Sequence, residues 1–265
     1  MKNKAWILNN KRKKYKLIDF IISCLVILYV IIRIFFVQFF FPEKIVSGNI
    51  TYRFNSFDQN KTAIVSQKEI NSFLKEVTDF IKANPFYDED IKINICFCNS
   101  RRQYAFWNPL TAFRGSLATS TNLFRTHTIM LSDPDFSTME ISYKNKDSRK
   151  IKDIILHEAT HSFLRKKYNF IKRLSLLPKW KEEGIAEAVA GSSTYDINKG
   201  LILFLKNEKD SSPTFEYFKY RLCILYLQKE KNMDYSQIIS SKQKYSEILD
   251  EISKYDESSI LLWFE

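Results

Sequence analysis

The residues best placed to do chemistry are His157, Glu158 and His161, within the run His-Glu-Ala-Thr-His. On a helix, positions four apart share a face, so the two imidazoles can reach one metal ion while Glu158 approaches a water bound to it. Zinc suits this arrangement, because it accepts two His and a carboxylate and leaves one position open. The alternative is a pair of surface His on an amphipathic helix, but the chain has only three His and apolar residues flank the run.

A third ligand is expected on a second helix that packs against the first. The segment Trp180–Glu187, which reads WKEEGIAE, begins late enough for the first helix to end and the chain to return antiparallel. Glu182 and Glu183 are its two candidate ligands. The alternative for this pair is an exposed acidic first turn that compensates the helix dipole.

These residues together resemble the gluzincin metallopeptidases, the class that contains thermolysin and the membrane-alanyl-type aminopeptidases. In those families an HExxH helix precedes a helix with a zinc-binding Glu, in the pattern W-x-x-E-G-x-A. The resemblance covers about residues 150–230 and implies that His157, His161 and Glu183 bind Zn²⁺. Glu183 is chosen because it directly precedes a Gly, as in the family pattern. The resemblance also implies that Glu158 is the general base.

Two further residues take supporting roles under this resemblance. Glu187 shares a helix face with Glu183, where thermolysin-like enzymes have a carboxylate that hydrogen-bonds the first His ligand; the alternative is an ordinary surface Glu. Tyr217 precedes a Tyr-Leu pair by nine residues. Related aminopeptidases have the same spacing between such a pair and the Tyr that donates a hydrogen bond to the oxyanion. Tyr220 is the alternative donor. The aminopeptidases' G-x-M-x-N motif is missing, so the resemblance does not imply recognition of a free N-terminus.

The predicted activity is that of a zinc metallopeptidase, which hydrolyses peptide bonds in a peptide or protein substrate. Zinc lowers the pKa of its bound water and polarises the scissile carbonyl, while Glu158 takes the water's proton and passes it to the leaving amine. One alternative is an inactive relative that binds zinc and serves as a binding or scaffolding module at the membrane. Another is a membrane-surface interaction protein whose basic N-terminus attracts anionic lipid.

The N-terminus predicts a membrane anchor. Residues 1–16 carry seven Lys or Arg and no acid, and an apolar run of 22 residues begins at Phe20. A helix of that length spans roughly 33 Å, enough to cross a bilayer core. We therefore expect a cytoplasmic tail at 1–16, a single-pass transmembrane signal anchor at 17–41 and an extracytoplasmic domain at 42–265. A cleaved signal peptide and an in-plane amphipathic helix are the alternatives, and Arg33 is costly within a bilayer.

Composition excludes several other classes. The net charge is +11, but the 249 residues after the basic tail carry only +4, so no nucleic-acid-binding domain is predicted. Scarce Gly and Pro together with 15% aromatic residues exclude a collagen-like or largely disordered chain. Four Cys are too few for a disulfide-stapled mini-protein. The oligomeric state is left open.

One α+β domain is expected for residues 42–265, with strands in its first half and helices in its second. This is a zincin-like arrangement, in which a small mixed sheet precedes the active-site helices. The first helix is expected to begin at the capping box Ser66–Glu69 and to end before Pro85. Strands are predicted at 91–98, 103–107 and 127–132, and later helices near 150, 178 and 213.

The strand at 127–132 has two interpretations. It is either an edge strand above the zinc, where a substrate adds as a further strand, or a plain buried strand. His127 is expected to be a structural or surface residue rather than a ligand. Cys96 and Cys98 share a strand face, which disfavours a bond between them, but either could pair with Cys223 in an oxidising compartment.

Overall fold

The computed structural model describes residues 18–29, 31, 40–55, 66–113, 115–123, 126–143, 147–193 and 195–265. Contacts divide the chain into two units, Met1–Pro42 and Glu43–Glu265. Within the first unit, residues 18–29 form a helix. The candidate chemistry lies entirely in the second unit.

The transmembrane helix expected at the start of the fold is not found among the described residues. In the parts of the chain that the structure describes, no helix combines the length and the apolar character that crossing a bilayer requires. The predicted basic tail at 1–16 and residues 32–39 lie outside the described residues.

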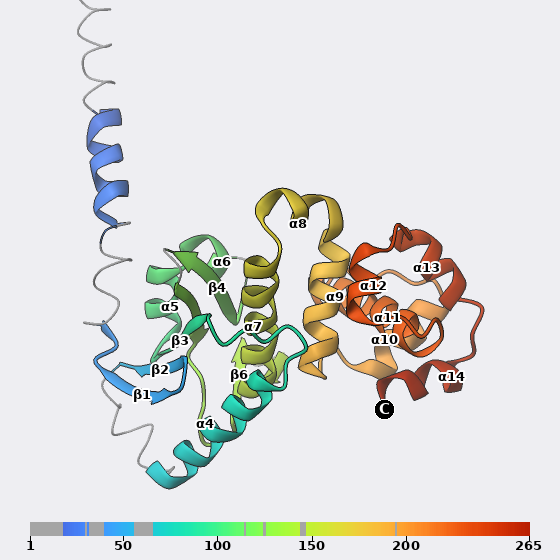
Figure 1. Ribbon diagram of the computed structural model, residues 1–265, viewed down its shortest axis with the longest axis horizontal. Coiled ribbons are helices and arrows are strands. Elements are labelled where there is room, and N and C mark those ends of the chain that lie inside the picture. The colour runs from blue at the N-terminus through green and yellow to red at the C-terminus, as the bar shows by residue number, and fades with distance from the viewer. Residues whose placement is uncertain are drawn as a thin grey trace, which may run out of the picture. The chain divides into compact units, whose positions relative to one another are not determined.

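The second unit alternates strands with helices and then becomes wholly helical (Figure 1). Its strands are β1 (Glu43–Ser47), β2 (Ile50–Phe54), β3 (Lys92–Cys98), β4 (Ala118–Leu123), β5 (Thr126–Ser132), β6 (Glu140–Tyr143) and β7 (Asp147–Lys150). Its helices are α4 (Gln67–Lys82), α5 (Arg101–Trp107), α6 (Pro109–Phe113), α7 (Ile151–Lys167), α8 (Phe170–Leu176), α9 (Lys179–Ala190), α10 (Ile197–Leu205), α11 (Pro213–Lys229), α12 (Tyr235–Ser240), α13 (Tyr245–Ile252), α14 (Glu257–Leu261) and the 3₁₀ turn η1 (Leu262–Phe264).

These elements form a mixed α/β fold on a five-stranded sheet, which corrects the predicted class of α+β with a transmembrane helix ahead of a zincin-like domain. The strand order is β1-β2-β3-β5-β4; β2, β3 and β5 are mutually parallel, whereas β1 and β4 run antiparallel at the two edges. Parallel neighbours need a crossover connection. α4 supplies it between β2 and β3, and α5, α6 and β4 supply it between β3 and β5. Helices are therefore interleaved with the strands of the sheet.

The strand predicted at 103–107 is also wrong, because these residues belong to α5. Aromatic residues at alternating positions favour a strand, but local capping favours a helix. Ser100 Oγ accepts a hydrogen bond from the backbone N–H of Gln103, and the Gln103 side chain accepts one from the backbone N–H of Asn99. Reciprocal bonds of this kind at the start of a helix outweigh the weak preference of single residues.

Other predicted elements are confirmed. The strands at 91–98 and 127–132 are β3 and β5. The capping box at Ser66 opens α4, with both of its reciprocal hydrogen bonds present. Pro178 is the N-cap of α9, and Pro213 lies in the first turn of α11.

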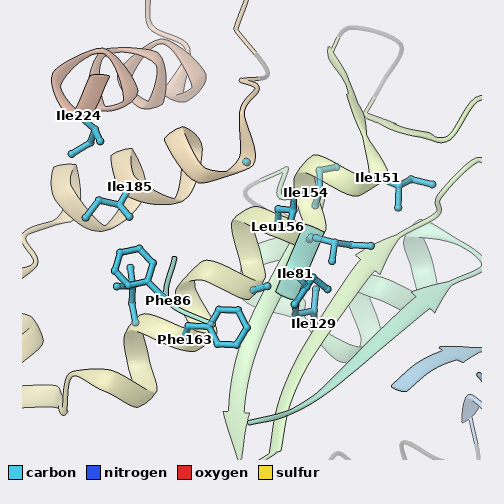
Figure 2. Close-up of a cluster of buried hydrophobic side chains, with 14 of the residues drawn as sticks. Ile81, Phe86, Ile129, Ile151, Ile154, Leu156, Phe163, Ile185 and Ile224 are labelled. Carbon is cyan, nitrogen blue, oxygen red and sulfur yellow. The ribbon is translucent and has the colours of Figure 1, made fainter. Parts of the chain in front are cut away.

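A continuous apolar core joins the sheet to the three helices that carry the candidate site. α7 contacts β4 on one side and α9 on the other, and α9 packs against α11 (Figure 1). Figure 2 shows this core from Ile129 of β5, through Ile154 and Phe163 of α7, to Ile185 of α9 and Ile224 of α11. Burying a side chain of this size contributes about 1.5–3 kcal/mol. The core therefore fixes the separation of α7 and α9.

Candidate metal centre

The predicted metal-binding run lies in the middle of α7, which is buried along most of its length. Thr160 anchors this segment, because its hydroxyl donates to the carbonyl of Leu156 and accepts from the side-chain amide of Asn84, each at 2.8 Å. Asn84 directly follows α4, so the contact ties α7 to that helix. His157 and His161 are buried one helical turn apart, on the face of α7 that meets α9.

Three side-chain atoms converge between α7 and α9. His157 Nε2 and His161 Nε2 are 3.1 Å apart, and Glu183 Oε2 lies 3.4 Å from the first and 3.3 Å from the second. Tetrahedral ligands with bonds of about 2.0–2.1 Å to zinc are separated by about 3.3 Å. The three atoms thus have the spacing of one face of such a tetrahedron. Within the described part of the chain, these residues form the cluster that could hold a metal ion.

Glu182, the other candidate ligand, faces a different atom. Its Oε1 lies 3.3 Å from His161 Nδ1, whereas Glu183 faces Nε2 of the same ring. Arg173 of α8 holds the Glu182 carboxylate, with hydrogen bonds from Nη2 of 3.2 and 3.1 Å to its two oxygens. Glu182 is therefore placed to orient the imidazole of His161 rather than to join its Nε2 atom at the metal position.

The first imidazole has a matching partner in Glu187, which is the first of the two interpretations that the sequence left open for this residue. Glu187 Oε1 lies 3.0 Å from His157 Nδ1 and accepts a hydrogen bond of 2.9 Å from Arg149 Nη1. Arg149, in β7, also donates through Nη2 to the carbonyl of Ser192 at 3.0 Å. Glu187 is 1% exposed, and a buried carboxylate without a cationic partner would be costly. Each imidazole thus faces its own carboxylate at Nδ1 and shares Glu183 at Nε2.

Negative charge dominates this site. Burial lowers the pKa of His161, but contacts with Glu182 and Glu183 outweigh burial and raise it to about 10. Burial also lowers the pKa of His157, and Glu187 together with Glu183 raises it overall. Burial raises the pKa of Glu183, yet the two imidazoles hold it well below its usual range. The carboxylates therefore stabilise positive charge at this position, whether protonated imidazoles or a bound cation carry it.

Gly184 allows α9 and α11 to approach closely enough to complete the site. A Cβ atom at this position would lie 2.5 Å from the carbonyl oxygen of Tyr220 and 2.8 Å from the side chain of Ile224, both on α11. A backbone oxygen cannot move aside as a flexible side chain can, so this separation requires Gly. The turn of α9 that carries Glu183 is thereby seated directly against the helix that carries Tyr217.

Tyr217 and Glu158, the predicted catalytic residues, lie around the same cluster. The pKa of Tyr217 is raised to about 12 by burial and then by nearby carboxylates that include Glu183 and Glu158. Glu158 is partly exposed on α7, and its charge also acts on His161. Tyr220, the alternative donor, packs its ring against an aromatic ring of α13, with centroids 5.2 Å apart. The charges of three of the site's carboxylates, Glu158, Glu183 and Glu187, therefore act on Tyr217, whereas only that of Glu183 is among the causes that raise the pKa of Tyr220.

The strand predicted at 127–132 had two interpretations, an edge strand above the zinc or a plain buried strand. It is β5, an inner strand of the sheet, and β4 lies at the edge beside it. β4 contacts α7, and Ser120 on β4 accepts hydrogen bonds from Arg165 of α7 to its carbonyl at 2.8 Å and its hydroxyl at 3.1 Å. His127 on β5 is buried and does not belong to the cluster of ligating atoms found in the described residues. Burial, followed by the charges of Arg165 and Lys166, lowers the pKa of His127 to about 4.

The buried cysteines Cys96, Cys98 and Cys223 are free, so neither optional pairing with Cys223 is formed. Burial raises the pKa of the Cys96 thiol to about 12. A thiol that stays protonated at neutral pH is a poor nucleophile and a poor metal ligand. These residues therefore act as small apolar side chains of the core.

Three residues that support the site carry little signal in the sequence. Arg149 and Arg173 lie in a short strand and a short helix, and only the folded arrangement brings them to Glu187 and Glu182. Glu182 adjoins Glu183 in the chain, but neighbouring positions on a helix diverge by about 100°. Because Glu182 is next to the predicted ligand Glu183, its side chain must leave the helix in a different direction. This is the one sequence signal that Glu182 has a separate role.

Comparison with known proteins assigns no family to this chain. No protein-family model matches it, and no curated protein matches it either.

Proposed function

We propose that this protein is a zinc-dependent metallopeptidase in which His157, His161 and Glu183 bind the metal. The observation that carries the proposal is the convergence of two imidazole nitrogens and one carboxylate oxygen at 3.1–3.4 Å. Structural zinc sites use four protein ligands, whereas catalytic sites use three and keep one position open. A set of three ligands therefore supports a catalytic role.

Zinc at this site would supply Lewis acidity and make a nearby water molecule more acidic. Glu158 accepts a proton from the attacking water and delivers it to the leaving amine. The hydroxyl of Tyr217 donates a hydrogen bond to the substrate oxygen that becomes negative in the transition state. Its pKa of about 12 keeps that hydroxyl protonated at neutral pH. Glu187 and Glu182 hold the imidazole rings in the orientation that directs both Nε2 atoms inward.

The choice of a peptide as substrate rests on the resemblance of residues 150–230 to gluzincin peptidases. One feature of the fold supports it. β4 forms an edge of the sheet and contacts α7, so an extended peptide can lie along β4 as an additional strand near the ligands.

The test of this function is the substitution Glu158→Gln. We expect zinc content to stay unchanged and turnover of fluorogenic peptides to fall by at least about 100-fold, because the water loses its proton acceptor. Glu76→Gln is the matched control, since it makes the same chemical change at an exposed residue that pairs with Lys152 of α7 at 3.0 Å. That control should alter neither quantity.

Two results would contradict the proposal. Full turnover in Glu158→Gln would exclude this residue as the general base. A wild-type protein that binds zinc but cleaves nothing in a broad peptide library would contradict peptidase activity and leave a zinc-binding module.

A further inference from the structure

Helix α8, which connects the two ligand-bearing helices, presents an apolar surface to solvent. None of its residues is buried, and Phe170, Ile171 and Leu174 are 71%, 77% and 70% exposed. Positions i, i+1 and i+4 of a helix are neighbours on its surface, so these side chains form one patch. In Figure 1, α8 projects at the end of the α7–α9 pair, away from α4. Large apolar side chains clustered in this way mark a surface that a partner covers.

The chain around this patch is strongly basic. Residues 159–181 contain no Asp or Glu. Basic residues occur there at Arg165, Lys166, Lys167, Lys172, Arg173, Lys179 and Lys181. The side chains of Lys166, Lys167, Lys172 and Lys179 are exposed. The surface is therefore apolar at the tip of α8 and cationic around it.

We propose that α8 is a membrane-docking element, with Phe170, Ile171 and Leu174 entering the interfacial region of an anionic bilayer while the surrounding lysines contact its headgroups. An anionic bilayer matches both properties of the surface, because its headgroups attract clustered Lys and its interface accepts Phe, Ile and Leu. Insertion of about 5–10 Å is typical of such helices. The docking element is independent of the helix at 18–29 and of the proposed peptidase activity.

Other partners fit the surface less well. A second copy of the chain would bring two cationic segments together, which like-charge repulsion opposes. An acidic protein would match the charge, but it would also need a groove shaped to three side chains on a projecting helix. A fluid bilayer needs no such shape complementarity.

The docking element is held in a fixed relation to the metal centre. Asn169 caps α8, with its side chain accepting a hydrogen bond from the backbone N–H of Lys172 at 2.9 Å. Arg173 on the same helix pairs with Glu182, which faces His161. Docking through α8 would therefore bring the candidate metal centre close to the bilayer surface.

The test places a polarity-sensitive fluorophore on α8 of the full chain. Residues 20–41 are themselves apolar, so total binding to vesicles would not report on α8, and a local probe is needed. Ser175→Cys in a Cys24→Ser background provides the attachment site, because Ser175 is exposed and the other cysteines are buried. The control label is at Ser258→Cys in α14, on the opposite side in Figure 1.

Vesicles of phosphatidylcholine with and without phosphatidylserine are the probes. We expect the label at position 175 to shift to the blue and to be quenched by brominated lipid with phosphatidylserine present, while the label at 258 stays unchanged. Replacing Phe170, Ile171 and Leu174 by Ser should lower the quenched fraction at least about tenfold. Replacing Lys166, Lys167 and Lys172 by Gln, or raising the salt to about 1 M, should remove the dependence on phosphatidylserine.

Three outcomes would overturn the proposal. One is a label at position 175 that stays in water with both kinds of vesicle while the chain is vesicle-bound. Another is equal insertion into neutral and anionic vesicles, because it would exclude the role of the lysines. A label that responds to soluble polyglutamate but not to lipid would assign the surface to an acidic protein instead.

Discussion

At the scale of single residues, carboxylates on both sides of each imidazole decide which nitrogen faces the metal position. Nδ1 of His157 faces Glu187 and Nδ1 of His161 faces Glu182, while both Nε2 atoms face Glu183. A proton on Nδ1 leaves the lone pair on Nε2, which is the state that binds zinc. Under the proposed function, the carboxylates of α9 thus supply orientation as well as ligation.

Glu187→Gln should weaken zinc binding without unfolding the protein. The amide keeps the size of the side chain but removes the charge that faces His157 Nδ1, so we expect the dissociation constant for zinc to rise about 10- to 100-fold. Competition with a chelating dye measures this constant, and circular dichroism checks the fold. Glu76→Gln again serves as the exposed control. An unchanged dissociation constant in Glu187→Gln would exclude a positioning role.

His127 gives a prediction for stability at acidic pH. Its pKa is about 4 in the folded chain, against an ordinary value of about 6.5. As the pH falls below about 6.5, the unfolded chain takes up a proton that the folded chain accepts only near pH 4. The free energy of unfolding therefore falls in this window, by up to about 1.4 kcal/mol per pH unit, and the residue contributes no pH dependence above about pH 7.5.

Urea unfolding at pH 7 and pH 5 measures this effect in wild type and in His127→Gln. The loss of stability between the two pH values should be smaller in the variant by about 1–2 kcal/mol. The comparison cancels the titration of the metal ligands, which both proteins share. Equal losses would show that His127 accepts its proton without hindrance in the folded chain.

At the scale of elements, the sequence predicts the ligand-bearing helices better than it predicts what surrounds them. Helix geometry alone places His157 and His161 on one face, because they are four residues apart. The prolines that begin α9 and α11 are strong local signals of a helix start. Arg101–Trp107 shows the opposite case, because its alternating aromatics favour a strand whereas the cap at Ser100 makes it a helix. The pairing of Arg149 with Glu187 depends on tertiary structure, which no local pattern encodes.

Gly184→Ala should separate α9 from α11 and disturb the site. The added Cβ would meet the carbonyl of Tyr220 at 2.5 Å, so we expect a loss of about 1–3 kcal/mol in the free energy of unfolding despite the better helix propensity of Ala. The shift also moves Glu183, so zinc affinity should fall. Gly200→Ala is the control. Its Cβ would lie 2.8 Å from the ring of Phe218, which is not one of the proposed ligands. Equal zinc affinity in the two variants would contradict this account.

At the scale of the whole molecule, opposite charges occupy neighbouring parts of one unit. The four carboxylates near the ligands, Glu158, Glu182, Glu183 and Glu187, lie on α7 and α9. The acid-free segment 159–181 lies between Glu158 and Glu182 in the chain. The net charge of +11 for the whole chain therefore describes neither the acidic cluster of Glu side chains nor the basic segment 159–181. Arg173 of the basic segment pairs with Glu182 beside the candidate metal centre, so the two regions meet at that ion pair.

The central claim is that the unit Glu43–Glu265 holds one zinc ion through His157, His161 and Glu183. Elemental analysis of the purified full chain tests it most directly, beside the variants Glu183→Ala and Glu182→Ala. We predict one zinc per chain in wild type, none in Glu183→Ala, and one zinc bound more weakly in Glu182→Ala. A folded wild-type protein without zinc after metal is offered, or loss of zinc in Glu182→Ala with retention in Glu183→Ala, would contradict the claim.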